Sequence, residues 1–381
     1  MTASSSSSMK LLYVVTEDKA FLSHRLPMAR AARDAGFDVH VAASVGSNAD
    51  AIRSEGFTIH PMPLRRGGLS PFGAISTIMA LRQIKCDLSP AIVHHVGMQI
   101  CVLGGISSLG MTTPQINAMT GLGYAFTSTT AKALFLRIVI AIALRFFLNR
   151  DHAVFLVQNP DDRAALETIG IAPRRLARIP GSGVDTDKLM PMPEPDGPIT
   201  VGFAGRLLTA KGIRALVAAH RILRTRGEDI RLLIAGTPDP ANPDSVTLEE
   251  AQQWGREPGI TWLGQINDIA SLWRDSHIAA LPSHREGLPK SLLEAAACGR
   301  SMIATDAPGC REIVKHQETG LLVPIEDPQA LASAISELAG SQELRARYGA
   351  AARQLVVDKM SAQAIGAATV ALYEEQLQRI R

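Results

Sequence analysis

Two carboxylates, Glu286 and Glu294, lie eight residues apart in a segment whose sequence predicts a strand, a loop and a helix. Pro289 is favoured at the first position of a helix, and Gly299 at its end. Glu286 is therefore expected in the loop, beside Gly287, which permits close approach of a ligand, and Glu294 inside the helix. Carboxylates accept hydrogen bonds from paired hydroxyls, and the amides at a helix N-terminus bind anions. The segment thus predicts a site for a ligand that carries both hydroxyls and phosphate.

Two cations follow another predicted strand. Gly205 and Arg206 come directly after the apolar residues 199–204, and Lys211 stands five residues beyond Arg206. Fixed positive charge of this kind stabilises the negative charge that develops on a departing diphosphate. Taken alone, each cation fits a solvated surface charge equally well. Their place after a strand-end glycine, with the carboxylate pair further along the chain, favours a binding site.

Short apolar runs alternate with helical stretches along the chain. This pattern is typical of βαβ units, which build parallel sheets and bind ligands beyond the carboxyl ends of the strands. Helices are predicted over residues 22–35 and 213–226. The predicted strands are residues 10–15, 38–43, 58–61 and 91–95 in one series, and 199–204, 231–235, 261–263, 277–281 and 301–305 in another.

A proline-rich segment separates the two series of strands, with four prolines in residues 191–198. Such a segment is typical of a linker between domains. The sequence therefore predicts an α/β chain of two Rossmann-like domains whose parallel sheets face each other across a cleft. The expected N-terminal domain is residues 9–185, the linker 186–198 and the C-terminal domain 199–381, and the last helix is a candidate to pack back on the first domain.

The composition excludes several classes of protein. The chain has 381 residues, of which 46% are hydrophobic and 20% charged, as expected for a globular protein and not for a disordered one. A net charge of +3 and an aromatic content of 4% give no support to nucleic-acid binding. The four cysteines form no C-x-x-C pair, which disfavours a zinc site and a disulfide framework and favours a reducing compartment. Neither a signal peptide nor a transmembrane helix is expected.

A very apolar stretch between Ala131 and Phe147 is interrupted by Lys132, Arg137 and Arg145. This mixture is typical of a basic amphipathic helix on an anionic membrane surface. A buried core helix whose arginines reach the solvent at its ends is the alternative. The charge distribution favours the membrane, because residues 1–185 carry 18 Lys and Arg against 12 Asp and Glu, whereas the rest carries 21 against 24.

The E-x₇-E spacing, embedded between a strand and a Pro-to-Gly helix, resembles the signature of retaining GT-B glycosyltransferases of family 4. The two cations, each beside a glycine, are similar to the phosphate-binding pair of that family. Further similar stretches are P-G-S-G-V-D at 180–185, D-A-P-G-C-R-E-I-V at 306–314 and T-G-L-L-V-P at 319–324. The resemblance covers nearly the whole chain and is most specific over residues 179–324.

The resemblance implies transfer of a sugar from a nucleoside-diphosphate donor, most often a uridine diphosphate sugar, with retention of the anomeric configuration. It implies that Glu286 binds the hydroxyls of the donor sugar and Glu294 those of the ribose, while Arg206 and Lys211 stabilise the leaving diphosphate. It implies no metal and no other cofactor. The expected donor-binding residues are Gly205, Arg206, Lys211, Glu286, Gly287, Leu288, Pro289, Lys290 and Glu294, of which Glu286, Arg206 and Lys211 are expected to act in catalysis.

The first domain departs from the family pattern, because the loop after its fifth strand lacks the histidine that several members carry there. The candidate residues on the acceptor side are His24, His94, Thr120 and Gly121; for His94, which precedes a second histidine at a strand end, a structural role is the alternative. Asp185 and Asp187 form a D-x-D pair, which holds a metal in transferases of another fold but is not expected to do so beside a linker.

The first-domain sequence is similar to that of bacterial transferases that extend polyprenyl-diphosphate-linked sugars. We therefore expect a lipid-linked saccharide acceptor and a peripheral location at the cytoplasmic face of the membrane. One alternative is a nucleotide-sugar epimerase of the same fold, which needs no acceptor. Another is a non-catalytic subunit that binds a sugar nucleotide.

Overall fold

The computed structural model describes residues 8–64, 70–121 and 131–379. These fall into two compact units, one within Met1–Ser182 and Ala362–Arg381 and the other within Gly183–Ser361. Each unit has its own parallel sheet covered by helices. In this division the chain end after residue 361 belongs with the first unit, and the segment predicted as the linker, residues 186–198, belongs with the second.

The first unit is built on a seven-stranded sheet in the order β3-β2-β1-β4-β5-β6-β7. All its strand pairs are parallel, and the middle of β1 is buried on both faces. The four strands predicted in this half of the chain are confirmed, and three more follow them. The strands are β1 Lys10–Glu17, β2 Asp38–Ser44, β3 Thr58–Pro61, β4 Ile92–Val96, β5 Gln115–Ala118, β6 Ala153–Val157 and β7 Leu176–Arg178.

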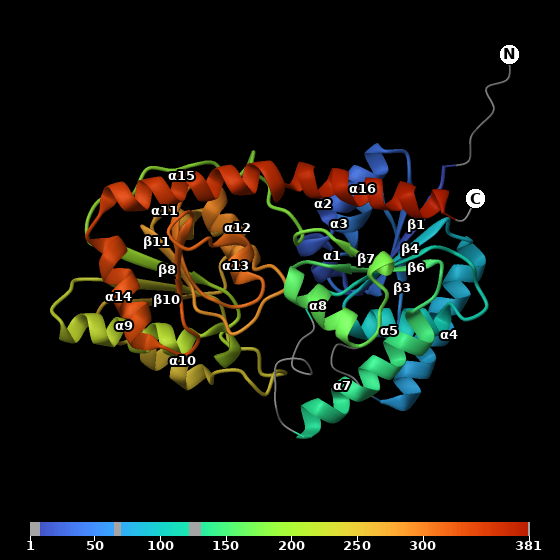
Figure 1. Cartoon of the computed structure of the whole chain (residues 1–381), viewed down its shortest axis with the longest axis horizontal. Helices are drawn as coiled ribbons and strands as arrows, with labels where there is room; N and C mark the ends of the chain where they lie inside the picture. The colour runs from blue at the N-terminus through green and yellow to red at the C-terminus, as the bar shows by residue number, and fades with distance from the viewer. Residues whose placement is uncertain (1–7, 65–69, 122–130, 380–381) are drawn as a thin grey trace, which may run out of the picture. The chain divides into compact units, whose positions relative to one another are not determined.

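One predicted helix of the first unit is two helices. The stretch 22–35 breaks at Arg25, because Pro27 occupies the first turn of a new helix and cannot continue the old one. The C-terminal helix α16 lies along α2 (Figure 1), where Gly366 faces Ala31. The helical elements are α1 Asp18–His24, α2 Leu26–Asp34, α3 Ala49–Ser54, α4 Pro71–Leu88, α5 Met98–Ser107, α7 Ala131–Ala143, the π-helix η1 Leu144–Leu148, α8 Pro160–Thr168, the 3₁₀ turn η2 Pro173–Arg175 and α16 Ala362–Gln378.

The second unit has a six-stranded parallel sheet in the order β10-β9-β8-β11-β12-β13. All five predicted strands are confirmed, and β13 is an addition. The strands are β8 Thr200–Ala204, β9 Arg231–Ala235, β10 Ile260–Gly264, β11 Ile278–Leu281, β12 Ser301–Thr305 and β13 Gly320–Val323. The helical elements are the 3₁₀ turn η3 Thr209–Lys211, α9 Ile213–Thr225, α10 Leu248–Trp254, α11 Ile269–Arg274, α12 Lys290–Ala297, α13 Cys310–Ile313, α14 Pro328–Ala339 and α15 Gln342–Lys359.

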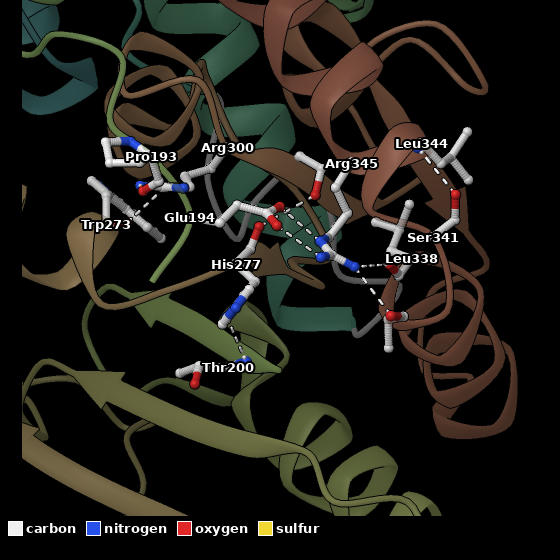
Figure 2. Close-up of polar contacts among 12 residues, drawn as sticks. Pro193, Glu194, Thr200, Trp273, His277, Arg300, Leu338, Ser341, Leu344 and Arg345 are labelled. Carbon is white, nitrogen blue, oxygen red and sulfur yellow. Dashed lines mark hydrogen bonds and ion pairs between the residues drawn. The ribbon is translucent and has the colours of Figure 1, made fainter. Parts of the chain in front are cut away.

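Buried arginines fasten the proline-rich segment to the second unit (Figure 2). Arg345 forms a two-pronged ion pair with Glu194, at 2.7 Å and 2.8 Å, and donates a further hydrogen bond to the carbonyl oxygen of Leu338 at 2.7 Å. Arg300 donates to the carbonyl oxygen of Pro193 at 2.8 Å. Charged hydrogen bonds of this geometry are among the strong ones. At these positions the segment is therefore part of the packed second unit.

Among the helices of the described residues, none combines the length and the apolar character that crossing a bilayer would require.

Candidate functional site

The predicted site residues of the second unit lie at the point where the strand order of its sheet reverses. Strand β8 lies between β9 and β11, and the two pairs are parallel, so the loops that leave these strands meet at one edge of the sheet. In open α/β sheets this switch point is the usual place for a ligand. The loop after β8 carries the two predicted cations, and the loop after β11 carries Glu286.

Gly212 allows the loop after β8 to touch the loop after β11. Its φ is +72°, a conformation that side chains disfavour, and an added Cβ would lie 1.9 Å from the carbonyl oxygen of Pro282. The backbone amide of His284 donates to the carbonyl oxygen of Ala210 at 2.8 Å and closes the contact. Lys211, between Ala210 and Gly212, is thereby placed beside the loop that follows β11.

Lys211 and Glu286 form an ion pair at the centre of the site. The Lys211 Nζ atom lies 2.5 Å from Glu286 Oε1, and the hydroxyl of Ser283 donates to the same oxygen at 2.7 Å. The side chains of Lys211 and Glu286 are 23% and 11% exposed, so the pair is only partly screened by solvent. The structure thus brings together two residues that are 75 positions apart, a contact that the sequence did not predict.

The loop after β12 holds the backbone of Glu286 in place. The Glu286 amide donates to the carbonyl oxygen of Pro308 at 3.0 Å. Gly309 has φ +79°, and a Cβ there would lie 2.5 Å from the Glu286 carbonyl oxygen and 2.7 Å from that of Gly287. This supporting contact is not predicted by the sequence motif; the Pro-Gly pair three residues after the end of β12 is the signal that could have found it.

Arg206 is paired with an aspartate that sequence reasoning missed. Its Nη1 atom lies 2.8 Å from Asp239 Oδ2, in the loop after β9. The two loops approach closely, because a Cβ on Gly236 would lie 1.8 Å from the carbonyl oxygen of Gly205. Asp239 could have been noticed as the acidic residue that follows the strand next to β8. Both predicted cations therefore have a carboxylate partner within the second unit.

The helix that carries Glu294 begins and ends as predicted. Helix α12 starts directly after Pro289, and Gly299, with φ +74°, follows its C-cap residue. Among the described residues no side chain caps its N-terminus. Leu288 packs against the hydrophobic core of the second unit and anchors the loop that enters the helix.

The Glu294 carboxylate is 13% exposed and lies 3.5 Å from the ammonium group of Lys290, one turn earlier on α12. Burial raises the pKa of Glu294 above its ordinary value, and Lys290 lowers it in part. The helix therefore presents a shielded carboxylate a turn beyond its N-terminal amides, in the order that the sequence predicted.

The raised pKa of Glu294 predicts how stability depends on pH. The folded chain holds this proton to a higher pH than the unfolded chain does, so the wild type loses stability as the pH rises from about 4.5 through the raised pKa. Glu294→Gln cannot lose a proton there. We expect the free energy of unfolding of the variant to increase relative to the wild type over this range, measured by urea unfolding between about pH 4 and pH 7. Parallel pH profiles would contradict this environment for Glu294.

The candidate residues of the first unit are not all accessible. His94 is completely buried; its ring stacks on Tyr13 with a centroid distance of 4.9 Å, and its Nδ1 atom lies 2.6 Å from the hydroxyl of Tyr373. This geometry favours the structural alternative, since His94 presents no surface to an acceptor. His24, at the end of α1, and Thr120, after β5, are exposed.

Gly121, three residues after the end of β5, has φ +119°, a conformation that favours glycine. The residues that follow it, 122–130, lie outside the described part of the chain. Gly121 and the exposed Thr120 stay candidates for contact with an acceptor, at the carboxyl edge of the first sheet.

The D-x-D pair forms a turn. Asp185 accepts hydrogen bonds from the backbone amides of Asp187 and Lys188, at 3.2 Å and 3.0 Å, and its other oxygen lies 3.4 Å from the Lys188 ammonium group. Within residues 8–64, 70–121 and 131–379, no group of three or more His, Cys, Asp and Glu side chains could hold a metal ion.

Comparisons with known proteins find two families. Residues 10–158 match the family described as glycosyl transferase 4-like, and residues 186–355 match glycosyl transferases group 1. One similar protein is the N,N'-diacetylbacillosaminyl-diphospho-undecaprenol alpha-1,3-N-acetylgalactosaminyltransferase of Campylobacter jejuni, 24% identical over 85% of this chain and 90% of that protein. Another is EpsD of Bacillus subtilis, which is provisionally named a glycosyltransferase. It is 25% identical over 91% of each chain.

Among solved structures, Anabaena HepE in complex with UDP-glucose superposes with a TM-score of 0.79 and 17% identity, over 96% of this chain and all of that one. A sucrose-phosphate synthase from Thermosynechococcus elongatus gives a TM-score of 0.82 with 20% identity, over 96% and 98% of the two chains. At these identities the likeness concerns the fold. Together with the two parallel sheets it confirms the predicted α/β fold of GT-B type.

Proposed function

Because the chain belongs to the glycosyltransferases, we propose that it transfers a sugar from a uridine diphosphate sugar to a lipid-linked saccharide, with retention of the anomeric configuration. The observation that carries the proposal is the contact between Lys211 and Glu286 at the switch point of the second sheet. Support for the donor comes from the UDP-glucose that HepE binds, and support for the acceptor from the undecaprenol-linked substrate in the name of the Campylobacter relative.

The two ion pairs suggest how the donor is received. A diphosphate carries more negative charge than a carboxylate, so it competes with Glu286 for Lys211 and with Asp239 for Arg206. Transfer of Lys211 to the phosphate leaves the Glu286 carboxylate to accept hydrogen bonds from the donor sugar. Binding of the diphosphate and recognition of the sugar are thereby coupled through one contact.

The helix α12 supplies the rest of the proposed donor site. Its N-terminal amides and helix dipole favour an anion, and they follow Glu286 after only three residues. Glu294, a turn further on, is placed to accept hydrogen bonds from the ribose. Gly287 and Gly205 let the ligand approach the backbone of the two loops.

The proposed reaction exchanges one bond at the anomeric carbon for another on the same face of the sugar. The bond to the diphosphate oxygen breaks, and the bond to the acceptor oxygen forms. The acceptor proton passes to an oxygen of the leaving diphosphate, whose developing charge Arg206 and Lys211 stabilise. Two fixed cations supply the charge that a metal ion supplies elsewhere, so we propose that the reaction needs no metal.

The experiment that tests the proposal is a transfer assay with purified protein, a panel of UDP-sugars and an undecaprenyl-diphosphate-linked saccharide. We expect one donor sugar to appear on the lipid, with the anomeric configuration of the donor when the product is analysed by NMR. Interconversion of donor sugars without acceptor would favour the epimerase. Binding of UDP without any transfer would favour the non-catalytic subunit.

We further propose that the first unit rests on the anionic cytoplasmic face of the membrane through α7 and η1. Large apolar side chains are exposed along these elements, with Ile138 at 51%, Ile142 at 50% and Phe146 at 69%. The charged residues between positions 131 and 150 are all basic. An apolar surface with basic residues and no acidic ones is the combination that anionic lipid headgroups attract.

Charge reversal tests this surface. The double substitution Arg137→Glu and Arg145→Glu is expected to weaken partitioning to vesicles that contain anionic lipid by at least about tenfold, since each basic residue near such a surface contributes on the order of 1 kcal/mol. The control is Arg53→Glu, which reverses one exposed arginine on α3, a helix that Figure 1 shows apart from α7. Equal partitioning of the double variant and the control in a flotation assay would refute this contact.

A further inference from the structure

Helix α4 carries large apolar side chains on its exposed face. Its inner face buries Thr77, Leu81, Lys85 and Leu88. On its outer face Phe72 is 84% exposed, Ile75 58% and Met79 61%. These three residues are spaced by three and four positions, so they form one stripe along the helix. An exposed stripe of large apolar side chains marks an interaction site more often than chance exposure does.

A groove opens beside the first turns of α4. Its volume is about 200 Å³. Leu64, Ala74 and Leu103 line it together with Pro63, Gly73 and the polar residues Ser70 and Gln99. The hydroxyl of Thr77, which also lines it, donates to the Gly73 carbonyl oxygen at 2.8 Å and is thus engaged within the helix. The groove is smaller than the roughly 300–1,000 Å³ of pockets that enclose a drug-sized molecule. Its size and lining fit a short length of hydrocarbon chain.

The groove lies near the proposed membrane surface and near the proposed acceptor side. Helix α5 packs against α4 and also against η1, the continuation of α7, and Figure 1 shows these helices together in the first unit. Leu64 follows β3 and Gln99 opens α5 after β4, so the groove begins at the carboxyl edge of the sheet.

We propose that this groove holds the first isoprene units of the lipid carrier of the acceptor, while Phe72, Ile75 and Met79 lie in the outer part of the bilayer. The inference rests on the proposed function, because only a polyprenyl-linked acceptor would bring an isoprenoid hydrocarbon to the groove. It adds a site for the hydrocarbon part of the substrate, at one edge of the first sheet.

The test measures binding of geranyl, farnesyl and geranylgeranyl monophosphate by equilibrium dialysis, below the concentrations at which these probes form micelles. The groove-filling variant is Gly73→Leu; a Cβ at this position meets only Ser70, at 3.8 Å, so the larger side chain can enter the groove. Leucine also favours a helix over glycine, which keeps α4 intact. The matched control is Ser76→Leu, which adds the same side chain to an exposed position of α4 outside the groove lining.

We expect the affinity of the wild type and of Ser76→Leu to rise by at least about tenfold from the shortest to the longest probe, as burial of several methylene groups predicts. Gly73→Leu should show less than about a threefold rise, with unchanged UDP binding and thermal stability. An equal rise in all three proteins would overturn the proposal, as would no rise in the wild type. The proposal would also be overturned if the rise in affinity were accompanied by self-association in sedimentation velocity. That result would assign the exposed stripe of α4 to contact with a second copy of the protein. The assay contains neither donor nor saccharide, so a failure of sugar transfer would be seen separately.

Discussion

Replacement of Glu286 by glutamine is expected to lower the turnover number of sugar transfer by about 10²- to 10³-fold, the scale on which a preorganised charged contact contributes to a transition state. The substitution keeps the shape of the side chain and removes its charge. Affinity for UDP should not fall, because the variant no longer competes with the diphosphate for Lys211. The turnover number comes from steady-state kinetics and the affinity from calorimetry.

A second glutamate provides the control for Glu286. Glu326 lies 3.5 Å from His284, in the loop that follows β13, and its side chain is 71% exposed. Glu326→Gln should change the turnover number by less than about twofold, because exposed contacts of this kind contribute little. If Glu286→Gln were as active as this control, or if it lost UDP binding and transfer in equal measure, the assigned role of Glu286 would be wrong.

Replacement of Gly212 by alanine is expected to lower the free energy of unfolding by about 3–5 kcal/mol. A left-handed conformation alone costs a residue with a Cβ roughly 1–2 kcal/mol, and the added atom would meet the carbonyl oxygen of Pro282 at 1.9 Å. The three tryptophans all lie in the second unit, so their fluorescence during urea unfolding reports on the part of the chain that changes.

Gly227 separates the two costs at Gly212. It has a similar φ of +80°, but an added Cβ there meets no atom within 4 Å. Gly227→Ala should therefore show only the conformational cost, on the order of 1 kcal/mol. The variant at Gly212 should in addition bind UDP more weakly at temperatures where it is folded, because the loop after β8 carries Lys211. Equal destabilisation at the two positions would mean that the loops are not locked together.

The helix with Glu294 could be predicted from the sequence because its signals are local. Pro289 and Gly299 mark its ends whatever the rest of the chain does. The contact of Lys211 with Glu286 could not, since it depends on β8 and β11 being neighbours in the sheet. Strand order is decided by long-range packing and leaves no mark on either loop. The same reason explains why Asp239, which follows β9, was missed.

Two further features of the structure also depend on distant parts of the chain. His94 looked like a candidate for acceptor binding because it ends a strand, yet Tyr373, 279 residues later, covers it and binds its ring nitrogen. The composition of the proline-rich segment predicts a linker between domains, and Glu194 within it pairs with Arg345 on α15. Composition predicts which segment of a chain is irregular. It does not predict which distant residue, here Arg345, will bind that segment.

The most direct test of the central claim is thermal unfolding of the wild type and of Lys211→Met with UDP, GDP, ADP and dTDP, each with and without EDTA. A ligand at 100 times its dissociation constant stabilises the folded state by about 2.7 kcal/mol, which gives a measurable shift. We predict that UDP raises the midpoint of the wild type equally with and without EDTA, and that Lys211→Met loses most of this shift. Binding of UDP at Lys211 without a metal would be contradicted if no nucleotide raised the midpoint, if the shift required a metal, or if Lys211→Met responded like the wild type.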